Sequence, residues 1–268
     1  MHPFLPALAA LILATPLAAC GKTADGGSSV LSRLNADTAF GEKVRAYLLE
    51  HPEVIEEAVT KLQAQKEAEA LKARDAEMAA ARTAIPKHRA ALERDPRDLV
   101  ANPNGSITVV EFFDYNCGYC KRAAPEILRL LEANPDIRVV FKEFPIFGDA
   151  SDSAAKVALT AAAKAQGLAL HKAFMATKPL DEAAIDRSLR AVGLDPAAVR
   201  GAAESAQIAN QLADVRNLAV ALKIEGTPAF IVGDTLIPGA DMEALTAAIA
   251  QARAKGMTQP DGKVATNR

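Results

Sequence analysis

The chain has 268 residues, of which half are hydrophobic, and its formal net charge is −2. This length allows one or two globular domains with an ample core. The near-neutral charge gives no electrostatic basis for binding nucleic acid, so no nucleic-acid partner is expected.

The first 20 residues are predicted to be a signal peptide, because they form a short apolar stretch that closes with small residues. The segment ends Leu17-Ala-Ala-Cys20-Gly21, which resembles a bacterial lipoprotein box and would make Cys20 the lipidated first residue of the mature protein. The start lacks Lys and Arg, so an ordinary cleaved signal with a chance cysteine is the alternative. Either reading predicts export to the bacterial periplasm or cell envelope, an oxidising compartment that suits disulfide exchange.

Residues 21–37 are rich in polar residues, glycine and serine, and predict a flexible tether. Helical periodicity follows, is interrupted at His51-Pro52, and continues to about Ile85. The second helix would be roughly 50 Å long, with an apolar stripe too narrow for stability on its own. We therefore predict that residues 38–96 form a helical oligomerisation arm that packs as in a coiled coil. A solvated stalk, or an arm folded back on the body, is the alternative.

A strand–helix–strand unit follows a short helix and a turn-rich linker. Residues 107–113 are apolar on both faces, as a covered central strand should be, and residues 137–144 form a second strand. The sequence Cys117-Gly-Tyr-Cys120 lies between them, at the start of a helical pattern. This order predicts a βαβ unit with parallel strands and both cysteines near a helix N-terminus.

That position favours redox chemistry. Unpaired N–H groups and the helix macrodipole stabilise a thiolate at Cys117, and in such sites the thiol pKa falls to roughly 3.5–7.5. Cys120 lies one helical turn further on, within disulfide reach, and would resolve a mixed disulfide held on Cys117. A structural zinc site would need further ligands at set spacings, and the four histidines are scattered. An inert structural disulfide is the other alternative, although so short a loop stabilises little.

The rest of the chain predicts a helical insertion followed by a hairpin. Residues 151–222 read as three or four helices inserted into the strand–helix scaffold. Two short apolar runs joined by Gly233-Asp234 predict a β-hairpin that opens with Thr227-Pro228. A last helix ends at about Ala254, and residues 255–268 are expected to be a disordered tail.

Three stretches together resemble the DsbA-like, ScsC-type exported thiol–disulfide proteins. They are Val110-Glu-Phe-Phe-Asp-Tyr-Asn-Cys-Gly-Tyr-Cys-Lys121, Phe141-Lys-Glu-Phe-Pro145 and Gly226-Thr-Pro-Ala-Phe230. The resemblance covers about residues 38–254 and implies an α/β, thioredoxin-like fold with an inserted helical subdomain, occupying residues 97–254, behind a long helical arm.

The resemblance also implies roles for individual residues. Pro228 would be a cis-proline facing the active site, exposing backbone at Thr227 to a substrate strand, with Gly118 and Tyr119 as further substrate contacts. Glu111 would lie beneath the redox pair and help proton transfer from the buried thiol. Lys142 in the neighbouring strand is its expected partner, whereas Glu143 is expected to point the other way. A satisfied ion pair with no part in turnover is the alternative.

The resulting prediction is an exported thiol–disulfide oxidoreductase, most simply a disulfide isomerase or oxidase, with no cofactor beyond a redox-active Cys117–Cys120 disulfide. Its expected partners are cysteine-containing envelope proteins, a membrane redox partner and copies of itself, with a trimer favoured over a dimer by analogy with ScsC-like relatives. A monomeric dithiol oxidase is one alternative. A second is a Cu(I)-binding protein of copper tolerance, because two adjacent soft thiolates suit that ion.

Overall fold

A computed structural model describes residues 27–256 and the side chains of residues 38–256. The predicted signal peptide, Cys20, the first part of the tether and the chain beyond residue 256 lie outside the described residues. The chain forms two compact units, which divide after Ala68.

The N-terminal unit consists of α1 (Gly27–Glu50) and the first part of α2 (Glu53–Ala84). The two helices separate at His51-Pro52, as predicted. The predicted tether is wrong over residues 27–37, which are helical, because Val30, Leu31 and Leu34 already recur at helical spacing. None of the helices described has the length and apolarity needed to cross a membrane.

The C-terminal unit is built on a five-stranded sheet of order β1-β3-β2-β4-β5. Its strands are β1 (Leu99–Ala101), β2 (Ile107–Phe113), β3 (Ile137–Glu143), β4 (Ala229–Val232) and β5 (Thr235–Pro238). β2 and β3 are parallel, which confirms the βαβ unit, and the other pairs are antiparallel. The sequence reading placed β1 in a linker, because its three residues are too few to show alternation and acquire strand geometry by pairing with β3.

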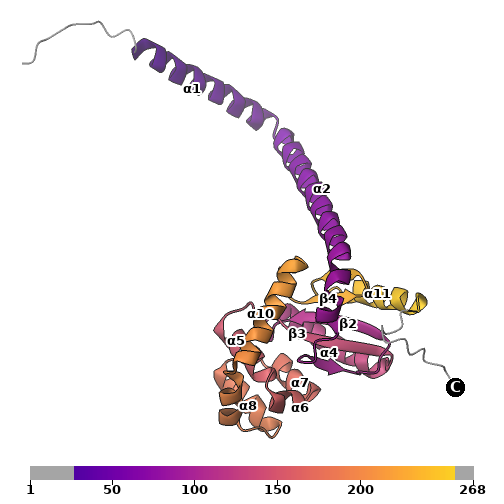
Figure 1. Cartoon of the computed structure of the whole chain (residues 1–268). Helices are drawn as coiled ribbons and strands as arrows, with labels where there is room; N and C mark the ends of the chain where they lie inside the picture. Colours follow the sequence, from indigo (N-terminus) through magenta and orange to yellow (C-terminus); the bar gives the residue numbers. More distant parts are fainter. Residues whose placement is uncertain (1–26, 257–268) are drawn as a thin grey trace, which may run out of the picture. The chain divides into compact units, whose positions relative to one another are not determined.

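Helices cover both faces of this sheet (Figure 1). The helices that follow α2 in this unit are η1 (Ile85–His88), α3 (Arg89–Glu93), α4 (Gly118–Ala133), α5 (Asp149–Ala158), α6 (Ala161–Ala165), α7 (Leu168–Ala176), α8 (Glu182–Ala191), α9 (Pro196–Ala203), α10 (Ala206–Ala221) and α11 (Met242–Ala254). The predicted helical insertion is confirmed, but α5–α10 are shorter and more numerous than the sequence indicated. Four of these helices begin at an N-cap residue whose side-chain oxygen accepts a hydrogen bond from a backbone N–H of the first turn. These N-cap residues are Thr160, Asp181, Asp195 and Ser205.

The two faces of β2 belong to two separate hydrophobic cores. Val109 and Phe113 pack in the larger core with α4, α7 and α11, whereas Val110 and Phe112 pack in a second core with η1, α3 and α10. Residues of α2, η1 and α3 are buried in this second core, namely Ala81, Ile85 and Leu92. The segment before residue 97, which the sequence assigned to the arm, is therefore partly an integral piece of the C-terminal unit.

Candidate active site

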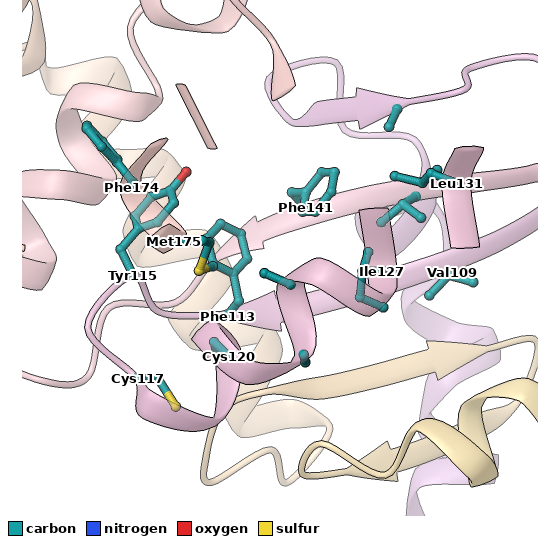
Figure 2. Packing of buried hydrophobic residues seen from close by; sticks show 14 of the residues in the cluster. Val109, Phe113, Tyr115, Cys117, Cys120, Ile127, Leu131, Phe141, Phe174 and Met175 are labelled. Carbon is teal, nitrogen blue, oxygen red and sulfur yellow. The ribbon is translucent and has the colours of Figure 1, made fainter. Parts of the chain in front are cut away.

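Cys117 and Cys120 lie at the N-terminal end of α4, directly after the β2 strand (Figure 2). Cys117 is the N-cap residue with an extended backbone, and its carbonyl accepts the first helical hydrogen bond, from Lys121. Both thiols are free and buried; Cys117 is 2% exposed and Cys120 is 0% exposed. The turn from β2 into the first residues of α4 thus places both thiols at the start of that helix.

The loop before β4 lies directly against Cys117. The Thr227–Pro228 peptide bond is cis, and the Cys117 thiol donates to the Thr227 carbonyl oxygen over 3.2 Å. Tyr119 is exposed, and the Arg122 guanidinium lies 4.1 Å from the centre of its ring. Tyr119, Thr227 and Pro228 line a groove of about 420 Å³, together with Leu236, residues 238–240 and the part of α2 near Met78. The Thr227 carbonyl oxygen and the cis peptide bond that follows it thus form the side of the site that faces Cys117.

Glu111 lies inside the β2 strand, where most of its neighbours are buried and apolar, and it is 1% exposed. One of its carboxyl oxygens, Oε1, is buried without a hydrogen-bond partner. Burial raises the pKa of Glu111 to about 8. Burial also raises the pKa of the Cys120 thiol, and the negative charge of Glu111 raises it further. The Cys120 thiol therefore holds its proton more tightly when Glu111 is charged than when Glu111 is neutral.

The predicted partnership between Glu111 and Lys142 is wrong. Glu111 is paired with Phe141 and Phe112 with Lys142 in the parallel register, so Lys142 shares the face of Phe112 and lies on the opposite side of the sheet. Its ammonium group pairs there with the Asp98 carboxylate and donates to the Ala91 carbonyl oxygen. The same register places Glu143, which was expected to point away, on the face of Glu111.

Asp114 connects the redox loop to the start of the insertion, a role that the sequence reading missed. Its Oδ1 accepts from the Asn116 N–H and the Ser151 hydroxyl, and its Oδ2 accepts from the N–H groups of Ile146 and Phe147. Four donors satisfy a buried carboxylate that would otherwise be costly. An aspartate placed directly after an apolar strand and three residues before Cys117 was the available signal.

Two further polar residues tie the start of α4 to the segment after α7. The Asn116 amide exchanges hydrogen bonds with both backbone groups of Leu180. Lys121 Nζ donates to the carbonyl oxygens of Phe174 and Thr177. The insertion is thus anchored on the redox loop itself. The described part of the chain contains no cluster of three or more His, Cys, Asp or Glu side chains suited to a metal ion.

Comparisons with known proteins agree with this architecture. The family model of the DSBA-like thioredoxin domain matches residues 108–250, and that of the copper resistance protein ScsC N-terminal domain matches residues 38–69. A thioredoxin-like oxidoreductase from Silicibacter pomeroyi DSS-3 is 40% identical, with a TM-score of 0.59, over 62% of this chain and 98% of that one.

Longer matches include the N-terminal helices. Proteus mirabilis ScsC in a transitional conformation is 28% identical, with a TM-score of 0.58, over 83% of this chain and 99% of that one. Salmonella enterica Typhimurium BcfH is 31% identical, with a TM-score of 0.57, over 84% and 99% of the two chains.

A curated relative, the Na(+)/H(+) antiporter NhaA 3 of Salinispora tropica, is 30% identical over 174 residues, or 63% of this chain. The match spans only 27% of that relative's length, so its named activity concerns a much longer protein. The domain match, which covers more than half of the chain, and the site geometry lead to one conclusion: the chain belongs to the DsbA-like family of thioredoxin-fold thiol–disulfide oxidoreductases, of the ScsC type.

Proposed function

We propose that this protein exchanges disulfides with cysteine-containing proteins of the bacterial envelope, and that it acts chiefly as a disulfide isomerase. The observation that carries the proposal is the contact of 3.2 Å between the Cys117 thiol and the Thr227 carbonyl oxygen, with Cys120 buried one turn behind. This arrangement offers an attacking thiol, a resolving thiol and a backbone edge for the substrate within one site.

The exchange proceeds in two balanced steps. The Cys117 thiolate attacks one sulfur of a substrate disulfide, which forms a mixed disulfide and releases the other substrate sulfur as a thiolate. Cys120 then transfers its proton to Glu111 in its ionised form, for which the raised pKa of about 8 makes this carboxylate a stronger base than an exposed one, and attacks the Cys117 sulfur of the mixed disulfide. The mixed disulfide breaks, the Cys117–Cys120 disulfide forms, and the substrate leaves reduced by two electrons. Isomerisation follows when the freed substrate thiolate attacks a different disulfide of the substrate, and the thiolate released there attacks the mixed disulfide before Cys120 does, which forms a new substrate disulfide and frees Cys117. Oxidation is the reverse of the full sequence.

The arm supports isomerase activity over simple oxidation. Large apolar side chains on α1 and on the first part of α2 are exposed in the single chain, among them Phe40, Tyr47, Ile55, Val59 and Leu62. A long helix with such an exposed stripe is stabilised when copies of the chain bury it together. An oligomer, for which we favour a trimer, would gather several Cys117 sites around one substrate. A monomer would favour a dithiol oxidase.

The test compares full-length variants, because a chain starting near Arg97 would also lose the core residues Ile85 and Leu92. Leu62→Glu places a charge on the apolar stripe, and Gln63→Glu places the same charge on a neighbouring exposed position as the matched control. Sedimentation reports the oligomer, and reactivation of scrambled ribonuclease reports isomerase activity. We expect Leu62→Glu alone to lose both while it still oxidises small dithiols.

Two results would contradict parts of the proposal separately. If Leu62→Glu keeps the wild-type oligomer and reactivation rate, the arm is not the device that makes an isomerase. If Cys117→Ala matches the wild type in every assay, the thiol–disulfide exchange itself is wrong.

A further inference from the structure

The end of α2 forms one wall of the groove beside the redox pair. Met78, Ala81 and Ile85 recur at spacings of three and four along the end of α2 and the start of η1, so they lie on one side of this helical segment. Ala81 and Ile85 are at most 2% exposed and belong to the second core. Met78, one turn earlier, is only half-buried and lines the groove. The second core therefore fixes this wall on the C-terminal unit, to which α2 belongs from Glu69 onwards.

The buried part of the groove lining is the margin of the same second core. Four apolar residues both line the groove and belong to that core, namely Leu222, Ile224, Ala229 and Leu236. Tyr119 of the redox motif and Pro228 line the groove as well. The groove volume of about 420 Å³ lies in the range of ligand sites, about 300–1,000 Å³. An apolar side chain that enters the groove beside the redox pair would therefore extend a core that the chain has already formed.

The charged side chains that line the groove balance each other in sign. Arg74 and Lys223 are cationic, Glu77 and Glu225 are anionic, and all four are exposed. Because the two signs balance, long-range electrostatic attraction favours neither acidic nor basic segments. Selection of a bound segment therefore depends on the apolar part of the lining.

We propose that Met78 is a specificity-determining residue of the thiol–disulfide exchange, and that it selects substrates in which apolar side chains flank the reacting cysteine. The inference rests on the proposed function, which places the substrate sulfur at Cys117. The Cys117 thiol contacts the Thr227 carbonyl oxygen, and Thr227 lines the groove. A substrate segment that runs from the reacting cysteine along the groove therefore meets Met78.

The occupant to which this geometry points is an extended, apolar segment of a substrate protein. Such segments are exposed in misfolded chains, the substrates on which an isomerase acts. The unbranched, polarisable side chain of methionine adapts to apolar side chains of different shapes, so Met78 would favour apolar character without requiring one sequence. The end of the arm would thus contribute to substrate selection as well as to oligomerisation.

The test measures how fast reduced full-length protein attacks peptides whose cysteine is held in a mixed disulfide with 5-thio-2-nitrobenzoate. The Cys117 thiolate attacks the peptide sulfur, a protein–peptide disulfide forms, and the coloured nitrobenzoate leaves as a thiolate. Two peptides of equal length and zero net charge are compared, one with leucine and phenylalanine beside the cysteine and one with serine and glycine there. Single turnovers at increasing peptide concentration separate the half-saturating concentration from the maximal rate of attack.

We expect the wild type to be half-saturated by the apolar peptide at a concentration about tenfold lower than by the polar one. Met78→Glu should raise the half-saturating concentration of the apolar peptide by about tenfold, because a carboxylate then lines the apolar groove. Met78→Leu, which keeps an apolar side chain of similar volume, should retain the preference, and Met78→Ala should lie between these two variants. Ala79→Glu is the matched control, since it places the same charge on an exposed neighbouring position that does not line the groove.

Equal half-saturation of the wild type by the two peptides, or an equal effect of Ala79→Glu, would overturn the inference while leaving thiol exchange intact. A changed sedimentation of Met78→Glu with an unchanged peptide preference would assign the groove to a contact between copies of the chain, and would overturn it too. If Cys117→Ala releases the nitrobenzoate from both peptides as fast as the wild type, the proposed function fails and the inference fails with it.

Discussion

Replacing Glu111 by glutamine is expected to stabilise the protein increasingly as the pH rises. Burial raises the pKa of this carboxyl group from 4.5 to about 8 in the folded protein. Between these two values the folded chain retains a proton that the unfolded chain has lost, so the stability of the wild type falls as the pH increases. Each unit of pKa difference corresponds to about 1.36 kcal/mol, so the penalty is about 3 kcal/mol at pH 7 and about 5 kcal/mol above pH 8.

Glutamine has nearly the same shape but cannot ionise, so Glu111→Gln escapes the penalty. Its buried amide adds a cost of about 1–3 kcal/mol if the N–H groups find no acceptor, but this cost is independent of pH. The test therefore measures the unfolding free energies of both proteins, in their reduced forms, by urea unfolding from pH 5 to 9. The quantity of interest is how the difference between these two free energies changes with pH. Glu126→Gln, at an exposed position on the same chain, is the matched control.

The unfolding free energy of Glu111→Gln minus that of the wild type is expected to be about 4 kcal/mol larger at pH 8 than at pH 5. A difference that stays constant over this range would show that Glu111 is not held protonated by burial. Such a result would also remove the basis for its proposed role in accepting the proton of Cys120.

Three further predictions concern the surroundings of the site. Lys142→Met should lower the unfolding free energy by about 3–5 kcal/mol, since it leaves Asp98 buried without its cation. Burial raises the pKa of Asp98 to about 6, and Lys142 opposes this rise. Asp98 is charged at pH 8 and largely neutral at pH 5, so the loss of unfolding free energy should be larger at pH 8. Equal losses at the two pH values in urea unfolding would contradict the ion pair. Asp114→Ala should cost about 3 kcal/mol, because several backbone donors lose their buried acceptor, and thermal unfolding should show it; a change within about 0.5 kcal/mol would refute that role. For the Cu(I) alternative, reduced protein should take up one ion per chain through Cys117 and Cys120 in competition with a chromogenic chelator, and uptake that survives Cys120→Ser would exclude the two-thiol site.

Most helices and strands, and their order along the chain, can be predicted from patterns in the sequence. Several signals depend only on residues that are close together in the sequence. They are the apolar run at 107–113, the helical spacing after Cys120 and the Thr227-Pro228 dipeptide. Strand pairing of the βαβ unit and the place of Cys117 at a helix N-terminus follow from that order, because short connections leave few ways to join such elements. The resemblance to the DsbA-like family rested on three equally short stretches, residues 110–121, 141–145 and 226–230.

The contacts between side chains of different elements depend on how those elements pair and pack. Alternation along β3 shows that Lys142 and Glu143 face opposite ways, but only the register with β2 decides which of them shares the face of Glu111. Lys142 therefore pairs with Asp98, and Glu143 joins Tyr115 and His171. The short β1 strand and the burial of Leu92 likewise depend on partners distant in sequence. If β3 were shifted by one residue relative to β2, every β3 side chain would lie on the opposite face of the sheet. Both faces of β3 are buried, so the pattern of its residues does not indicate which register forms.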